Sequence, residues 1–246
     1  LTLVLVVSVF SVVGAQEVNN PDTFTYVTIG DQSTLDPHFA YDTGSSELIY
    51  QVYESLIDYE GESVQDFVPR LSTEVPSYEN GLISEDGTEY TFVVREGVEF
   101  SNGNSLTAED VKYSFLRGMV MDRAGGPIWM LYEPLFGAGF SGLSDVTTEV
   151  VGVEDPKQLT DEQAEEVFAA LDEKITVDGN EVTFHLASPY PPFLNIVAQG
   201  ASWSSILDEE WSIEQGAWDG TASDIAASHD PVKEEDPLFD KMMGTG

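Results

Sequence analysis

Residue types that could perform catalysis or bind metals occur in this sequence, but their spacing does not fit those chemistries. The three histidines, His38, His185 and His229, are scattered and match no metal-ligand spacing. His185 alternates within an expected strand, which favours a structural role. Residues 139–143 (GFSGL) depart from the G-x-S-x-G nucleophile elbow at the last position and are not framed by a strand and a helix. We therefore reject a serine hydrolase.

Acidic side chains dominate the charge, because 45 Asp and Glu against 9 Lys and Arg give a formal net charge of -36 at pH 7. Close carboxylate pairs arise by chance among so many acids, so they lend little support to a hydrolase with a carboxylate pair. The calcium-loop pattern of alternating Asp or Asn ending in Glu does not occur. We interpret the charge as a heavily solvated surface that repels nucleic acid and anionic membranes. We expect no metal, no cofactor and no nucleic-acid partner.

The start of the chain indicates export. Residues 1–10 are almost wholly apolar, and small residues at 13–15 precede Gln16, which predicts a secretory signal peptide over 1–15. Since the chain begins with Leu1, it is either truncated at its start or uses an alternative start codon. The sequence contains no cysteine, which excludes disulfides, thiol catalysis and a lipid anchor on an N-terminal cysteine. We expect a periplasmic or extracellular protein without a lipid anchor.

Residues 86–115 give the clearest local structure. Tyr90, Phe92 and Val94 alternate with polar or smaller residues, which predicts a half-buried strand. After a glycine-rich break, Thr107 predicts the N-cap of a helix, and Asp110 lies where a carboxylate can reach back to the cap amide. This stretch is a strand, a polar turn and a capped amphipathic helix, and nothing in it is catalytic.

Further elements are mixed irregularly along the chain, which favours an α/β or α+β fold. We expect strands at 24–29, 175–177, 181–186 and 203–207, with a hairpin turn at 178–180, and helices at 47–57, 159–172 and from 192 or 193. Residues 125–143 are rich in glycine and aromatics, and the chain from 216 onward is polar and loop-like.

Several segments, taken in order, resemble one known family. They are LDP (35–37), YESL (53–56), VPRL (68–71), residues 86–111, VTFHL (182–186), PPFL (191–194) and GTG (244–246). This set resembles the solute-binding proteins of ABC importers for peptides, nickel and related solutes, the oligopeptide-binding class. It is more specific than any single motif because the segments are colinear from 24 to 246.

The resemblance implies a periplasmic-binding-protein-like fold of two lobes that close around an extended solute. Family members are longer, so we expect here only the first lobe with its inserted subdomain. After the signal peptide (1–15), residues 16–42 and 174–246 would form the two parts of that lobe, and 43–173 the subdomain. The resemblance also implies a binding protein rather than an enzyme.

The loop after LDP lines the ligand cleft in the family. The residues at the matching positions, which we expect to contact ligand, are Tyr41, Asp42, Thr43 and Ser46. A polar loop between a strand end and a helix start can offer amides and hydroxyls to a ligand. The alternative is an ordinary surface turn with Ser45 or Ser46 near a helix cap.

Trp129 matches a position at which relatives place an aromatic side chain in the cleft. A tryptophan on a loop can stack on a ligand group, and the alternative is a core tryptophan beneath the loop. Trp203, Trp211 and Trp218 have no such match, so we expect them to serve packing.

The leading hypothesis is the extracytoplasmic solute-binding component of an ABC importer. Its partners would be an oligopeptide or other small solute and the permease subunits in the membrane, and we expect a monomer. Two alternatives stay open: a secreted acidic hydrolase, and a solute receptor for signalling. Sequence alone does not separate transport from sensing.

Overall fold

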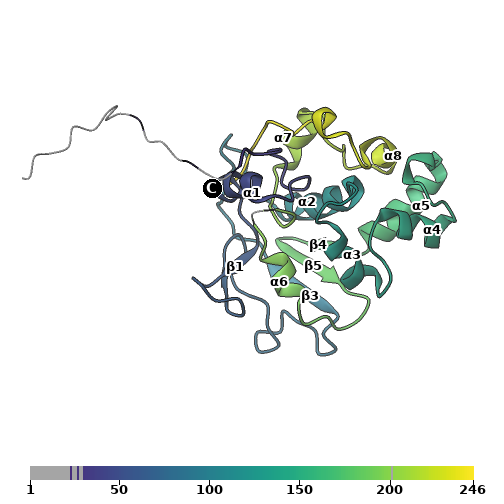
Figure 1. Ribbon diagram of the computed structural model, residues 1–246. Coiled ribbons are helices and arrows are strands. Elements are labelled where there is room, and N and C mark those ends of the chain that lie inside the picture. The colour runs from purple at the N-terminus through teal and green to yellow at the C-terminus, as the bar shows by residue number, and fades with distance from the viewer. Residues whose placement is uncertain (1–22, 24–26, 28–29, 201) are drawn as a thin grey trace, which may run out of the picture.

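A computed structural model describes residues 23, 27, 30–200 and 202–246 of the chain (Figure 1). The expected signal peptide and, apart from Val27, the expected strand at 24–29 lie outside the described residues. Within the described ranges, no helix is both long and apolar enough to cross a membrane.

A three-stranded antiparallel sheet carries the main core on one face. Its strands are β3 (Glu89–Val93), β5 (Glu181–His185) and β4 (Ile175–Asp178), in the order β3-β5-β4. Tyr90, Phe92 and Phe184 are buried on one face. The hydroxyls of Thr91 and Thr183 meet on the other, 2.9 Å apart. The expected alternation and the hairpin at 178–180 are confirmed.

Helix α2 (Ala108–Met121) packs on the buried face of the sheet. Its N-terminus is a capping box, because the Thr107 hydroxyl accepts from the Asp110 amide and the Asp110 carboxylate accepts from the Thr107 amide. The ring of Phe115 meets Phe184 edge to face, with centroids 4.8 Å apart. The expected cap and helix are confirmed.

The expected helix at 47–57 begins earlier and ends sooner than its apolar pattern indicates. Helix α1 spans Thr43–Val52, because Asp42 caps it and the chain becomes extended at Tyr53. The end of the expected helix is instead strand β1 (Ile57–Tyr59), which pairs antiparallel with β2 (Phe67–Pro69). Of its buried apolar residues, Ile49 lies in helix α1, Tyr53 and Leu56 lie in the connecting segment, and Ile57 lies in strand β1.

The glycine-rich region at 125–143 contains one helix, and a second begins at its last residue. Helix α3 covers Trp129–Phe136 and α4 covers Leu143–Val151; a short 3-10 turn, η1 (Pro156–Gln158), leads to α5 (Asp161–Asp172). Helix α5 confirms the expected acidic helix at 159–172. Helices α4 and α5 pack together at the edge of the molecule opposite α1 (Figure 1).

The last part of the chain returns across the molecule to α1. Its elements are α6 (Phe193–Val197), α7 (Glu209–Glu214), η2 (Ala222–Asp224), α8 (Ile225–Ser228) and η3 (Lys233–Glu235). Helix α6 confirms the expected short helix. The expected strand at 203–207 is wrong: this segment is turn and coil, in which the hydroxyls of Ser202, Ser204 and Ser205 bond to backbone carbonyls.

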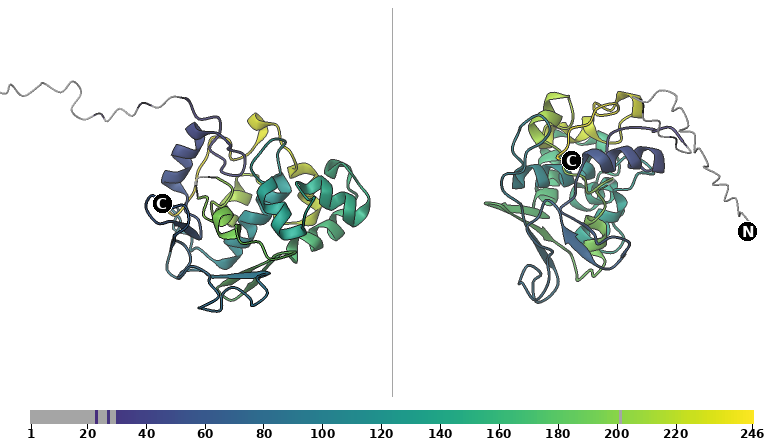
Figure 2. Two further views of the ribbon diagram at one scale, coloured as in Figure 1. Left: turned by 60° about the horizontal axis from the view of Figure 1, so that its bottom comes forward. Right: turned by 90° about the vertical axis from the view of Figure 1, so that its left-hand side faces the viewer.

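The C-terminus lies against the end of α1 in every view (Figures 1 and 2). The amide of Gly246 donates to the Val52 carbonyl at 2.9 Å, and the amide of Ser101 donates to the Gly244 carbonyl at 3.0 Å. A Cβ at position 244 would overlap the Val52 carbonyl, so only glycine allows this approach.

One large hydrophobic cluster contains residues of both 43–173 and 174–246. The sheet also joins these two ranges, because β3 pairs with β5. A smaller cluster packs α1 against the returning chain through Ile49, Tyr53, Leu207 and Leu238. The division of the chain into lobe and subdomain segments stays a prediction.

Candidate functional site

The loop that precedes α1 is held by its own hydrogen bonds. The Asp42 carboxylate caps the helix by accepting from the Ser45 amide at 2.9 Å, and it also accepts from the Ser33 hydroxyl. Partial burial acts to raise the pKa of Asp42, but these hydrogen bonds outweigh it and the pKa lies below its ordinary value. Asp42 is thus an ionised helix cap.

Ser45 anchors the same loop from below. Its side chain is fully buried, and its hydroxyl accepts from the amides of Ser33 at 2.9 Å and Thr34 at 3.2 Å. Tyr41 is 52% exposed, and Thr43 is also exposed. The capping alternative therefore describes Asp42 and Ser45, while Tyr41 and Thr43 remain accessible to a ligand.

Trp129 begins α3 and is 49% exposed, so it is not a core tryptophan beneath a loop. It borders a hollow of about 350 Å³ between α3, α6 and β1. Three further aromatic residues line this hollow, Tyr59, Tyr190 and Trp203. We call it the aromatic hollow.

Amide side chains form the polar part of the aromatic hollow. The Asn195 and Gln199 amide nitrogens donate to the Tyr59 hydroxyl at 3.4 and 3.2 Å. Glu133 adds an exposed carboxylate from α3. The hollow thus combines ring surfaces, amides and one acid, which can hold a ligand group by stacking and hydrogen bonding.

Two consecutive residues link the aromatic hollow to the loop before α1. The Ser202 hydroxyl donates to the Ala40 carbonyl at 3.1 Å, next to Tyr41 in the chain. The adjacent Trp203 lines the hollow and donates from its indole to the Ile196 carbonyl at 3.0 Å. Trp203 was expected only to pack; it is 9% exposed and also forms a wall of the hollow.

A buried ionic cluster, which sequence reasoning missed, lies behind the loop. Arg117 of α2 bonds the Asp36 carboxylate with both terminal nitrogens and approaches an oxygen of Asp236 at 3.6 Å. It also lies 3.0 Å from Nδ1 of His38. A basic residue within an otherwise apolar helix face was the signal that could have found this cluster.

The two acids of the cluster, Asp36 and Asp236, have pKa values shifted in opposite directions. Burial acts to raise the pKa of Asp36, but the Arg117 guanidinium outweighs it and lowers that pKa. Burial, followed by the neighbouring charge of Asp36, raises the pKa of Asp236 to about 8. Burial, and then Arg117, lowers the pKa of His38 to about 3, so His38 is neutral. At neutral pH, Asp36 and Arg117 are the ion pair and Asp236 keeps its proton.

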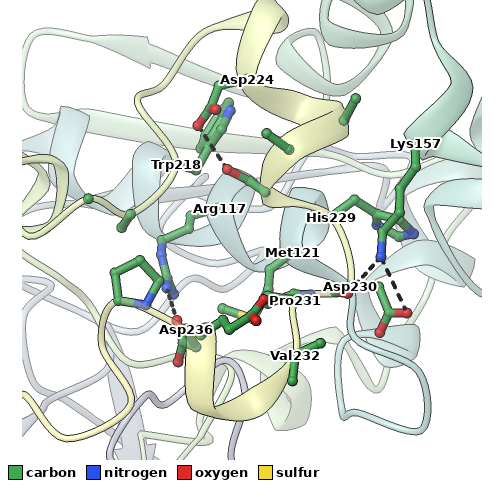
Figure 3. A pocket seen from close by; sticks show the side chains of 17 residues that line it. Arg117, Met121, Lys157, Trp218, Asp224, His229, Asp230, Pro231, Val232 and Asp236 are labelled. Atoms are coloured by element: carbon green, nitrogen blue, oxygen red, sulfur yellow. Dashed lines mark hydrogen bonds and ion pairs between the residues drawn. The ribbon is translucent and has the colours of Figure 1, made fainter.

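Arg117 and Asp236 of this cluster also line a cavity of about 480 Å³ (Figure 3). Its walls come from α2, Lys157 and the returning chain from Gly216 to Pro237. Both basic groups of the cavity are paired with acids: Arg117 with Asp36 and Asp236, and Lys157 with Asp230, whose carbonyl is 2.9 Å from Nζ. In the described part of the chain, no three His, Cys, Asp or Glu side chains are grouped to hold a metal ion.

The fold is that of part of a periplasmic binding protein. Two solved structures with a similar fold are the periplasmic binding protein DppA of Helicobacter pylori in complex with the peptide STSA and OppA of Listeria monocytogenes bound to peptide. Both align with a TM-score of 0.52 over 88% of this chain and 34% of theirs, at 22% and 18% identity. The mixed helix-and-sheet fold is therefore confirmed, as part of a longer architecture.

The chain belongs to the bacterial extracellular solute-binding proteins, family 5, whose middle region it matches over residues 66–246. Members of this family are periplasmic or extracellular binding proteins and not enzymes, which confirms the resemblance drawn from the sequence.

Curated relatives agree with this family. Oligopeptide-binding protein OppA of Bacillus subtilis (strain 168) is 29% identical over 124 residues, which are 48% of this chain and 21% of OppA. A probable deoxycholate-binding periplasmic protein, YgiS of Escherichia coli (strain K12), is 26% identical over 184 residues, which are 74% of this chain and 31% of YgiS. The chain therefore spans about a third or less of the relatives it matches.

Proposed function

We propose that this protein is the extracytoplasmic solute-binding component of an ABC importer and delivers peptides to permease subunits in the membrane. The observation that carries the proposal is the accessible aromatic hollow beside the loop before α1, in a chain of a solute-binding family whose relatives include oligopeptide-binding proteins. Export through a signal peptide at 1–15 and action as a monomer belong to the same proposal.

Ligand contacts would come from the loop before α1 and from the aromatic hollow, which Ser202 and Trp203 connect. Tyr41, Thr43 and Ser46 offer hydroxyls and backbone groups to the amides of an extended peptide. Asp42 would act mainly by fixing the start of α1, because its carboxylate oxygens are engaged within the loop. Trp129 would stack on a ligand side chain. A second lobe would close over this surface.

The test is binding without chemistry. The full-length protein is incubated with a defined peptide mixture, and the bound fraction and supernatant are analysed by mass spectrometry. We expect intact peptides in the bound fraction and an unchanged supernatant. Cleaved peptides would overturn the proposal in favour of the secreted acidic hydrolase, and the absence of any bound peptide would contradict it.

Calorimetry on variants locates the site. Trp129→Ala should weaken peptide binding about tenfold, because a stacked ring contributes on the order of 1.4 kcal/mol. Val150→Ala, which removes exposed apolar surface from α4, is the control and should bind like the original protein. Equal affinity of the Trp129 variant would remove this residue from the ligand site.

The signalling receptor is separated from the importer by a transport readout. The loaded protein should stimulate ATP hydrolysis by the reconstituted permease and ATPase of its own system. Peptide binding without such stimulation would favour a receptor that only senses the solute.

A further inference from the structure

The proposed function leaves open which group of a ligand enters the aromatic hollow. The residues that line the hollow indicate the chemistry of that group. The geometry points to a site for a cationic group, the guanidinium or ammonium of a basic peptide side chain. That the cationic group belongs to a peptide rests on the proposed function. That the hollow binds a cation does not.

The donors of the hollow are largely engaged within the protein. The Asn195 amide nitrogen donates to the Tyr59 hydroxyl and to the Val64 carbonyl, at 3.4 and 3.2 Å. That of Gln199 donates to the same hydroxyl and to the Asn195 carbonyl, at 3.2 and 3.3 Å. The Trp203 indole donates to the Ile196 carbonyl. The Trp129 indole and the Tyr190 hydroxyl bond to no described residue, so they are the side-chain donors left for a neutral ligand.

Electron-rich groups remain available. No described residue donates a hydrogen bond to the side-chain oxygen of Asn195 or Gln199, so both can accept from a ligand. Glu133 is exposed on the same hollow, and none of the described residues lining it is Lys or Arg. A group that carries several N–H donors and a positive charge complements this set.

The rings favour the same charge. Four aromatic residues line the hollow, and within the described ranges Trp129, Tyr190 and Trp203 stack on no other ring. The negative face of an aromatic ring attracts a cation within about 6 Å, most strongly for tryptophan and most often for arginine. Cationic side chains that do lie over rings in this protein, such as Arg123 over Phe39, are elsewhere.

Size allows a long basic side chain to enter. A hollow of about 350 Å³ exceeds the volume of one planar guanidinium with its aliphatic stem, and apolar lining residues such as Met130 and Ile196 can contact that stem. Arginine fits better than lysine, because a flat guanidinium stacks on a ring and donates along its edge at the same time.

Peptides that differ only in charge test the proposal. Calorimetry compares tetra-alanine peptides in which arginine, lysine, leucine or citrulline is placed at each position in turn; citrulline has nearly the shape of arginine but is neutral. At one position we expect arginine to bind at least tenfold more tightly than citrulline. Equal affinities at every position would overturn the proposal.

Glu133→Gln should reduce the ratio of the arginine-peptide affinity to the citrulline-peptide affinity about fivefold or more. Trp129→Leu should weaken binding of the arginine peptide more than binding of the other peptides. Glu165→Gln, which removes the same charge from an exposed site on α5, is the matched control and should leave the ratio unchanged. An equal effect of both glutamine variants would assign the preference to the overall negative charge and overturn the site.

A peptide-independent measurement separates the two proposals. Ethylguanidinium and the neutral N-ethylurea are titrated separately into the protein while the indole resonance of Trp129 is followed by NMR. We expect a saturable shift with ethylguanidinium alone. If no peptide binds but this shift occurs, the proposed function fails and the cation site stands. Equal responses to the two probes would refute the cation site.

Discussion

Asp236 is a buried acid that Arg117 does not fully compensate. Arg117 is shared with Asp36, which holds it through two nitrogens, so Asp236 reaches the guanidinium only at 3.6 Å. Burial then favours the neutral acid, and the pKa of Asp236 rises to about 8. A protonated Asp236 leaves one net positive and one net negative charge in the cluster, which is the arrangement a buried site tolerates.

The contribution of Asp236 to stability should therefore fall with rising pH. The pKa of Asp236 is about 8 in the folded protein against 3.8 ordinarily, so its contribution is complete below pH 3.8 and is lost as pH rises through 8. Between these values the folded state keeps a proton that the unfolded state releases. His38, whose pKa is lowered from 6.5 to about 3, has the opposite effect below pH 6.5, so we expect the net fall in the free energy of unfolding, up to about 1.4 kcal/mol per pH unit, between about pH 6.5 and 8.

Asp236→Asn should flatten this decline, because an amide keeps the shape and a donor without titrating. Urea unfolding at pH 5 to 9 measures it, and we expect the variant to be the more stable at pH 9. Asp240→Asn, at an exposed position nearby, should retain the original profile. Matching profiles for Asp236→Asn and the original protein would contradict this assignment.

Sequence reasoning could have indicated a buried charge at Arg117, but it could not have identified the acids that pair with it. Asp36 lies in the LDP segment and Arg117 on the expected helix, but nothing local indicates that position 236 approaches both. Contacts between such distant positions depend on the whole fold. The same limit applies to the aromatic hollow, since Trp129 was expected from family resemblance while Tyr59 and Gln199 were not.

At the scale of elements, local rules succeeded where caps and alternation were strong. The capping box of Thr107 and Asp110 and the alternation of β3 predicted both elements. Helix α4 was missed because Gly142 at its start supplies no side-chain cap and its sequence is rich in Val and Thr, which favour helix weakly. The expected strand at 203–207 failed because serine hydroxyls bind its backbone instead.

Helices α2 and α5 both begin with a capping box, which allows a buried cap to be compared with an exposed one. Thr160 and Gln163 cap α5 at the surface, whereas Asp110 of the Thr107 box is 6% exposed and has its pKa raised by burial. Thr107→Ala removes a hydroxyl that donates to a buried carboxylate at 2.6 Å. We expect it to cost about 2 kcal/mol, and Thr160→Ala about 1 kcal/mol or less.

Chemical denaturation measures both cap variants under one condition. Far-ultraviolet circular dichroism of the folded variants serves as the control for retained helix. Equal costs for the two substitutions would show that burial of Asp110 adds nothing to the cap.

For the molecule as a whole, the net charge of -36 sets the balance between solubility and stability. Several of the few basic side chains form ion pairs with acids, such as Lys112 with Asp172 and Arg70 with Asp58. The acids that lack such partners repel one another at the surface, which opposes the compact state.

Salt should consequently stabilise the fold. Raising sodium chloride from about 0.01 to 1 M shortens the Debye length from about 30 to 3 Å and screens this repulsion. We expect the midpoint of urea unfolding to rise over this range, and to rise equally in potassium chloride because screening does not distinguish the cations. An unchanged or falling midpoint would show that surface repulsion does not limit stability.

The return of the chain to its beginning also affects the order in which the protein can fold. The Thr34 hydroxyl donates to the Phe239 carbonyl across 205 residues, and the Leu35 amide donates to the same carbonyl at 2.8 Å. A ribosome adds residues in sequence order, so the segment around Asp36 is made long before its partners exist. Contacts of such high sequence separation close late and slow folding. Until residue 239 has been synthesised, the early segment therefore lacks these contacts.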